Sequence, residues 1–364
     1  MPDIIVWDGF YYGRQRMKLY SRCIPNGSLP YESIEATTRM AAKLFEKIPY
    51  IPFMPKINNK DNILRRTISN IPGINITEND KIAFRPSEKT EKKLKLLDKA
   101  FISPTKENLA EFGFEAPFLE KFLQMNKKFK SPNACVNLLG PFTLSQYLLE
   151  NADIQLLADK NYRKIVIQSI SVKAMWVIDK IREYNPQAEV LIILEEPLMG
   201  KFGDVQRQSE IVTLELITTL LTRVIEKIKS YGGIVGIQCM EKCNWQIPIN
   251  AGADLISFDA YNNPNNLNII PETIIDFISK GGKICWCIVP VMKESIVKSL
   301  NVEYLKTRLL TTFDGLVLAG VPANFVYNSS FVSVQGNLDH LPLIFGEKAL
   351  ILATQLSKKI PVLS

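Results

Sequence analysis

The sequence of 364 residues predicts an α/β protein, a closed (β/α)8 TIM barrel with an insertion in its N-terminal half. From Ala134 onward, strand candidates alternate with helix candidates at least five times. These strands are apolar along their whole length, which is typical of a parallel sheet covered on both faces. No GxGxxG pattern follows any strand, so a doubly wound dinucleotide-binding sheet fits less well than a barrel.

The N-terminal half begins with a short strand candidate over residues 20–24, which ends at a turn cluster. A helix is expected to follow Ser33, a favoured N-cap residue. Prolines at spacing three over residues 49–55 then favour an extended loop. Residues 57–115 are polar, carry one weak strand pair around residues 74–84, and are expected to be an insertion within a single domain that spans residues 1–364.

The remaining elements follow a regular pattern. Further strands are expected over residues 134–139, 189–194, 233–237, 254–258, 283–289 and 330–334. Helices are expected over residues 159–184, 209–231, 273–280, 302–312 and 343–356, with a turn over residues 140–143.

The composition excludes several classes of protein. A net charge of +7 without a basic stripe argues against nucleic-acid binding. His340 is the only histidine, which disfavours sites with several histidine ligands, and we expect it to be a surface or capping residue. The six cysteines lack the spacing of a secreted scaffold, and no leader or membrane-spanning segment is evident. A reduced, cytoplasmic protein without membrane contact is therefore expected.

Carboxylates end two of the predicted strands, where barrel enzymes place their chemistry. Glu195 and Glu196 are adjacent, so they point to opposite faces and at most one can face the barrel mouth. That residue would hold a substrate ammonium or transfer a proton, and a rim salt bridge is the alternative. Asp259 is either a second site carboxylate or the cap of the turn that follows it.

Four cysteines lie near two strand ends. Cys239 and Cys243 are separated by three residues, whereas Cys285 and Cys287 project to one face of the same strand. A metal site of four cysteines is one interpretation. Core packing is the favoured one, because free cysteine is readily buried.

Several stretches, taken together, resemble the catalytic barrel of cobalamin-independent methionine synthase and its short relatives, which share a superfamily with uroporphyrinogen decarboxylase. These stretches are residues 27–30, 48–55, 140–143, 194–197, 256–260, 286–290 and 320–322. The resemblance implies methyl transfer to a homocysteine-like thiol, with a methyl-carrying folate or corrinoid protein as donor. It implies Glu195 and Asp259 as catalytic residues. The substrate-binding residues would be Asn26, Gly27, Ser28, Thr143 and Glu196.

The same resemblance implies a zinc ion that converts the thiol into a thiolate. The family's ligand positions fall on Gln238, Met240, Asp259 and Gln335, so that only the carboxylate is retained. Glutamine amide is a poor zinc ligand, and a methionine thioether suits softer metals. An offset site built from Cys239 and Cys243 is an alternative that we rank below a metal-free protein. The cofactor therefore stays unidentified.

Two other functions remain open. A lyase related to uroporphyrinogen decarboxylase would hold carboxylates with arginines, but Arg14, Arg16 and Arg22 do not match that enzyme's N-terminal motif. A non-catalytic barrel that binds a small molecule or a corrinoid protein is favoured by the loss of three zinc-ligand positions. The oligomeric state is not predicted.

Overall fold

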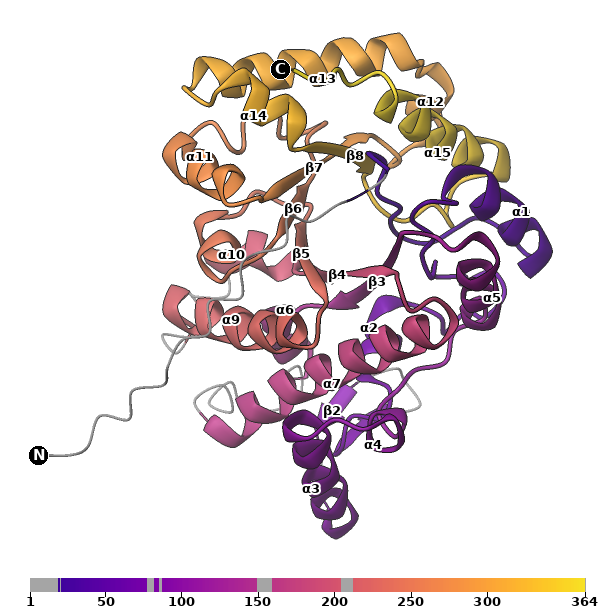
Figure 1. Ribbon diagram of the computed structural model, residues 1–364, viewed down its shortest axis with the longest axis vertical. Coiled ribbons are helices and arrows are strands. Elements are labelled where there is room, and N and C mark those ends of the chain that lie inside the picture. Colours follow the sequence, from indigo (N-terminus) through magenta and orange to yellow (C-terminus); the bar gives the residue numbers. More distant parts are fainter. Residues whose placement is uncertain are drawn as a thin grey trace, which may run out of the picture.

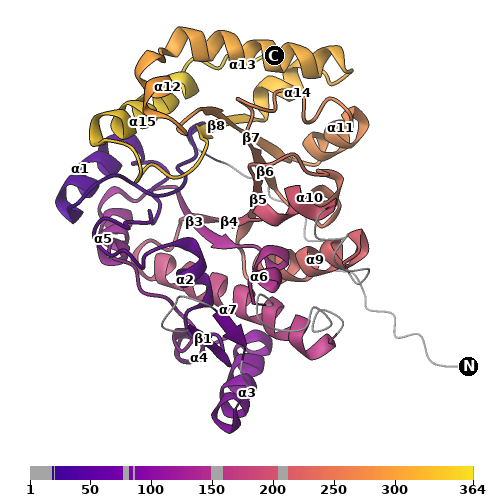
Figure 2. The same cartoon turned by 180° about the vertical axis from the view of Figure 1, so that it is seen from behind.

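A curled parallel sheet lies at the centre of the computed structural model, which describes residue 19 and residues 21–76, 82–84, 87–148, 159–203 and 212–363. Six strands follow one another in chain order across this sheet, and helices surround it (Figures 1 and 2). The strands are β3 (Asn133–Leu139), β4 (Glu189–Glu195), β5 (Ile234–Cys239), β6 (Leu255–Phe258), β7 (Lys283–Val289) and β8 (Ser330–Val334).

The parallel register brings the carboxyl ends of the strands to one edge of the sheet. Glu195 pairs with Gln238, and Gln238 pairs with Ser257 on the next strand. The strands are buried along their length, as their apolar sequences predict; all seven residues of β3 are buried. The α/β class and the parallel arrangement are thus confirmed.

Two short extended segments lie between the edges of this sheet. Parallel bridges join Cys23 to Val332 on β8, Tyr50 to Cys135 on β3, and Ser28 to Phe53 between the segments. The described sheet is therefore TIM-barrel-like, with six formal strands where eight were expected. Proline explains the difference, because residues 25, 49, 52 and 55 are prolines and lack the amide donor that a longer ladder needs.

The helices pack outside the sheet and connect its strands. They are α1 (Ile34–Leu44), α5 (Leu119–Phe129), α6 (Pro141–Tyr147), α7 (Lys160–Tyr184), the 3₁₀ helix η2 (Pro197–Lys201), α9 (Leu214–Ser230), α10 (Gln246–Asn250), α11 (Pro271–Ser279), α12 (Glu294–Ser299), α13 (Val302–Leu318), α14 (Ala323–Asn328) and α15 (Leu343–Ser357). The Ser33 hydroxyl accepts a hydrogen bond from the Ala36 amide, so the predicted N-cap of α1 is confirmed. Among the described residues, no helix is both long and apolar enough to cross a membrane.

One predicted helix and one predicted turn are corrected at the starts of α9 and α6. The helix expected from residue 209 begins as α9 at Leu214, because the Thr213 side chain caps its first turn; residue 209 itself lies outside the described residues. The turn expected over residues 140–143 is the start of α6, with Gly140 as N-cap and Pro141 in the first turn. Proline is favoured at that position because its missing amide donor would have no helical partner there.

Residues 57–115 contain α2 (Ile63–Ile68), α3 (Glu88–Ile102), α4 (Lys106–Ala110) and the antiparallel pair β1 (Ile74–Ile76) and β2 (Ile82–Phe84). The predicted strand pair is confirmed. Most of this region packs along α7 at one end of the molecule (Figure 1). It contributes buried apolar side chains, including Leu97, Leu109 and Phe112, to the common core.

Candidate functional site

Five polar side chains meet at the carboxyl end of the sheet, and we call them the mouth cluster: Asn26, Asn137, Glu195, Gln238 and Ser257. They come from an extended segment and from four consecutive strands, so only the parallel topology brings them together. Asn137 Nδ2 donates to Glu195 Oε1 at 2.7 Å and to Asn26 Oδ1 at 3.0 Å. Gln238 Nε2 donates to the same Asn26 oxygen at 3.3 Å, and Ser257 Oγ donates to Gln238 Oε1 at 3.3 Å.

This network determines how the Asn26 amide is oriented. The Glu195 carboxylate only accepts hydrogen bonds, so Asn137 must face it with its NH2 group. The NH2 groups of Asn137 and Gln238 both point at the same atom of Asn26, which must therefore be the amide oxygen. The NH2 group of Asn26 therefore points away from Asn137 and Gln238. Asn26 is only 1% exposed, and its Nδ2 has no hydrogen-bond partner in the described part of the chain. A buried donor without a partner is costly, which makes it a candidate contact for a ligand.

Glu195 and Glu196 point to opposite sides, as their adjacency predicts. Glu195 is partly exposed at the mouth. Burial of its carboxyl group raises its pKa to about 7, although the hydrogen bond from Asn137 acts to lower the pKa. Glu196 is fully buried and accepts the amide hydrogens of Phe142 at 2.9 Å and Thr143 at 2.7 Å, at the N-terminus of α6. Burial raises the pKa of Glu196 to about 7, and the bonds from Thr143 and Phe142 oppose that rise.

Glu196 and Thr143 were expected to bind substrate, but their contacts are with each other. The Thr143 hydroxyl accepts a hydrogen bond from the Leu198 amide at 3.3 Å, and both residues are fully buried. This pair joins the start of α6 to η2. The Glu196 amide donates to the Gln238 carbonyl oxygen at 2.8 Å, but among the described residues neither side chain is hydrogen-bonded to a side chain of the mouth cluster.

Only the first residue of the expected Asn26-Gly27-Ser28 site belongs to the mouth cluster. Gly27 has a φ of +73°, and a Cβ there would lie 2.6 Å from the carbonyl oxygen of Gly336, so only glycine fits. The Ser28 amide donates to Asn337 Oδ1 at 2.9 Å, and its hydroxyl donates to the Asp339 carboxylate. Gly27 and Ser28 therefore hold the chain segment after β8 instead of presenting free groups.

The four family positions for zinc do not form a zinc site. Asp259 accepts hydrogen bonds from Gln335 Nε2 at 2.7 Å and from the amide and side chain of Asn262 at 3.0 and 2.7 Å, which confirms its interpretation as a turn cap. Gln238 bonds within the mouth cluster, and Met240 adds only a thioether. No group of three histidine, cysteine or acidic side chains within reach of one ion occurs among the residues with described positions. Zinc does not fit this donor set.

Within the described part of the chain, the cysteines also belong to no group of three possible metal ligands. Cys285 and Cys287 are buried in β7 and contact each other, so their prediction as core residues is confirmed. Cys287 Sγ lies 3.3 Å from Ser257 Oγ, directly next to the mouth cluster. Cys239 and Cys243 contact each other but have no third ligand in the described ranges, which counts against the offset site.

Sequence reasoning missed Asn137 and Ser257. Each is a polar residue inside an apolar strand, and each is nearly inaccessible, with 4% and 1% exposure. A buried polar side chain within an apolar run was the signal that could have found them, because such a residue needs a partner from a neighbouring strand. His340 is exposed, and its Nε2 lies 2.8 Å from the Val291 carbonyl oxygen, which confirms the surface or capping prediction.

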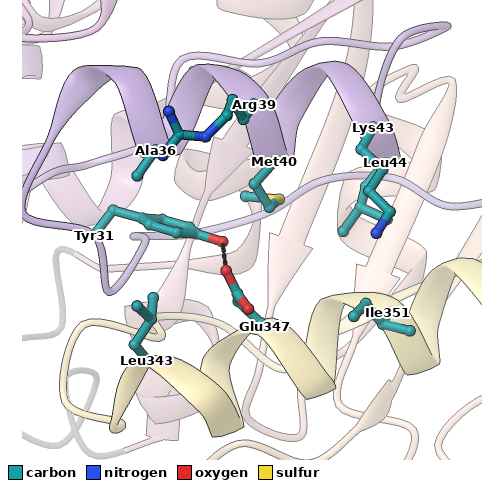
Figure 3. Close-up of a pocket in the computed structure, with 9 residues that line it drawn as sticks. All are labelled: Tyr31, Ala36, Arg39, Met40, Lys43, Leu44, Leu343, Glu347 and Ile351. Carbon is teal, nitrogen blue, oxygen red and sulfur yellow. Dashed lines mark hydrogen bonds between the residues drawn. The ribbon is translucent and has the colours of Figure 1, made fainter.

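A separate cavity of about 330 Å³ lies between α1 and α15 (Figure 3). The hydroxyl of Tyr31 donates across it to Glu347 Oε1 at 2.6 Å. Arg39 and Lys43 line it from α1, and both side chains are exposed. It belongs to the outer helix layer, and none of the mouth cluster residues lines it.

Comparison with known proteins identifies no family. No protein-family profile matches the chain, and no curated protein matches it. Among solved structures, it is similar to one from Coccidioides immitis, described as a crystal structure of an assigned fructose-1,6-biphosphate aldolase. That similarity has a TM-score of 0.24 at 10% identity, over 73% of this chain and 93% of the other. It carries no information on what this chain binds.

Proposed function

We propose that this chain binds a small polar molecule with both an ammonium group and a hydrogen-bond acceptor, at the carboxyl ends of its strands. In this proposal the two extended segments complete an eight-stranded barrel around the site. The observation that carries it is the pair of unused groups in the mouth cluster. Asn26 presents a buried donor without a partner, and Glu195 has one carboxyl oxygen that accepts no hydrogen bond from the described residues.

These two groups complement a ligand of the amino-acid type. An ionised carboxylate in a poorly hydrated site is stabilised by a cation, and the mouth cluster itself contains none. An ammonium group would therefore lie against Glu195, and a carboxylate or carbonyl oxygen would accept from Asn26 Nδ2. Because the pKa of Glu195 is raised to about 7 by burial, this residue is also suited to exchange a proton near neutral pH.

Methyl transfer to a homocysteine-like thiol, from a folate or corrinoid-protein donor, is the second candidate function. It is favoured by one observation: Asn26, which the motif resemblance assigns to substrate binding, and Glu195, which it assigns to catalysis, are joined through Asn137 in one site. Because zinc does not fit, the thiol proton would pass to a protein group, and Glu195 is the mouth residue able to accept it.

Titration calorimetry with L-homocysteine and L-methionine, each beside its analogue without the α-amino group, tests the binding proposal. The Glu195→Gln variant keeps the shape but removes the charge, so amine ligands should bind about 10- to 100-fold more weakly, as expected for loss of a charged hydrogen bond of about 1.5–3 kcal/mol. The analogues without an amine should be unaffected. Asn26→Ala should weaken both kinds of ligand.

The pH dependence provides a second readout. Amine binding should strengthen as the pH rises from about 6 to about 8, because Glu195 becomes ionised over this interval. Glu226→Gln, which alters an exposed carboxylate on α9, is the matched control and should change nothing. Equal binding of amine ligands by wild type and Glu195→Gln, or no binding of either amino acid, would refute the proposal.

A further inference from the structure

The cavity of about 330 Å³ between α1 and α15 has an apolar lining that comes from both helices (Figure 3). The apolar side chains that face each other across it include Met40 and Leu44 on α1, and Leu343 and Ile351 on α15. Its volume is at the small end of the range for ligand pockets in proteins, which is about 300–1,000 Å³. The cavity is therefore suited to a small ligand with an apolar body.

Two cations lie on the α1 wall of this cavity. Arg39 and Lys43 are four residues apart on the helix, which places their Cβ atoms about 5–6 Å apart, so that both can reach one anionic group. Both side chains are exposed, and neither forms an ion pair with an acidic side chain in the described part of the chain. Like charges at this spacing repel each other, and an anion between them would relieve the repulsion.

The opposite wall adds positive potential at one end. α15 begins at Leu343, which lines the cavity, and its first turn contains no acidic residue. Its cap residue, Pro342, makes no side-chain hydrogen bond to the first amides. The positive end of the α15 dipole is therefore not offset by the helix's own first turn, and it lies beside the cavity.

Glu347 also lines the cavity, but its Oε1 accepts the hydrogen bond from Tyr31 at 2.6 Å. The described lining thus carries two cations against one carboxylate. Figure 3 shows the cations on α1 and Glu347 on the facing helix. An anionic ligand is therefore favoured over a cationic one, with its charged end on the α1 wall and away from Glu347.

We propose that this cavity binds a small carboxylate with an aliphatic chain. The carboxylate lies between Arg39 and Lys43, because a guanidinium pairs with a carboxylate through two parallel hydrogen bonds and the ammonium adds a second charge. The chain lies between the apolar side chains of α1 and α15, where burial removes apolar surface from water. This site is independent of the mouth cluster, because none of the mouth cluster residues lines the cavity.

Titration calorimetry of the purified full chain with sodium octanoate tests this proposal, and octanol is the comparison probe with the same chain length but no charge. Octanoate should bind about 4- to 25-fold more tightly than octanol, because each exposed cation contributes about 2- to 5-fold. The double variant Arg39→Gln, Lys43→Gln should bind both probes equally. Arg223→Gln, at an exposed position of α9, is the matched control and should bind octanoate as the wild type does.

The methyl resonances of carbon-13-labelled methionine locate the ligand. The Met40 resonance, assigned with the Met40→Leu variant, should shift on addition of octanoate, whereas that of Met292, which is exposed shortly after β7, should not. The proposal is overturned if octanoate does not bind, if octanol binds as tightly to the wild type, or if the double variant still distinguishes the two probes. It is also overturned if Met292 shifts in place of Met40, since octanoate would then lie at the carboxyl end of the sheet.

Discussion

At the scale of single residues, the adjacent carboxylates Glu195 and Glu196 have different surroundings because strand side chains alternate between faces. Glu195 faces the mouth cluster, where Asn137 donates to it at 2.7 Å. Glu196 faces the helix layer, where two backbone amides of α6 donate to it. One residue is therefore available to a ligand, and the other stabilises the connection between α6 and η2.

The buried carboxyl of Glu196 predicts a measurable effect of pH on stability. Its pKa is raised from 4.5 to about 7 in the folded state, so the folded protein holds more protons than the unfolded chain between these values. Its contribution to stability is therefore complete below about pH 4.5 and is lost as the pH rises through about 7. Urea unfolding across this interval should show a weaker pH dependence for Glu196→Gln than for wild type.

The exposed Glu226 on α9 again supplies the control, since Glu226→Gln should keep the wild-type pH dependence. An unchanged slope for Glu196→Gln would show that this carboxyl titrates at the same pH in the folded and unfolded states.

At the scale of elements, α2 belongs to the core although it lies in the expected insertion. Arg66 of α2 pairs with Asp61 through two hydrogen bonds of 2.6 and 2.7 Å, and both side chains are buried. Arg66 also donates to the carbonyl oxygens of Ile51 and Pro52, next to the bridge at Phe53. Its guanidinium lies 4.3 Å from the centre of the Phe53 ring. This one side chain ties α2 to an extended segment of the barrel.

Removal of Arg66 should therefore be severe. Arg66→Met leaves the Asp61 carboxylate buried without its cation, and such a loss costs about 3–5 kcal/mol. Lys280→Ala, which removes an exposed pair with Asp276 on α11, should cost about 0–1 kcal/mol and is the matched control. The free energy of unfolding in urea measures both. A cost for Arg66→Met no larger than that of the control would contradict this role.

A buried lysine fastens the insertion at a second point. Lys173 on α7 is 1% exposed and donates to the carbonyl oxygens of Ser69 and Phe112, each at 2.7 Å. Burial lowers its pKa to about 7. Within the described ranges its ammonium donates to three backbone carbonyl oxygens and to the Ser69 hydroxyl, and to no carboxylate. Lys173 thus attaches the insertion to α7 from within the core, in addition to the surface ion pairs Lys106–Glu183 and Lys164–Asp98.

At the scale of the whole molecule, the two short extended segments decide whether the curled sheet is closed. The Ile24 amide donates to Val332 at 3.0 Å, Leu29 to Phe53 at 3.0 Å, and Cys135 to Pro49 at 2.9 Å. These bonds run from β8 through both segments to β3. Asn26 lies within the first segment, so the geometry of the mouth cluster depends on these bonds.

Hydrogen exchange tests the closure. The amides of Ile24, Leu29 and Cys135 should exchange within about 10-fold of the amides of β5, because breaking the ring would require opening of the core. The amide of Lys60, in an exposed turn, donates only to the Asn58 side chain at 3.0 Å, so it should exchange rapidly and serves as the reference for a weakly protected site. Exchange at Ile24 and Leu29 as fast as at Lys60 would show that the segments open independently of the six-stranded sheet.

Local pattern was sufficient for much of the fold. The expected strands at residues 283–289 and 330–334 have the observed bounds of β7 and β8, because a buried strand requires an unbroken apolar run. The start of α6 was missed, since its first amides are capped by Glu196, more than fifty residues away in the chain. The integration of α2 was missed for a similar reason, because the carbonyl partners of Arg66 lie outside its helix.

The sequence by itself determined the α/β class, the parallel strands, and Glu195, Asn26 and Gln238 as residues near the strand ends. These features depend on local hydrophobic pattern and on position in a strand. Only the tertiary structure decided that Asn137 and Ser257 complete the cluster, that Asp259 and Gln335 satisfy each other, and that Asn26 retains an unused donor. Hydrogen bonds between side chains of different strands depend on register and closure, which local sequence does not specify.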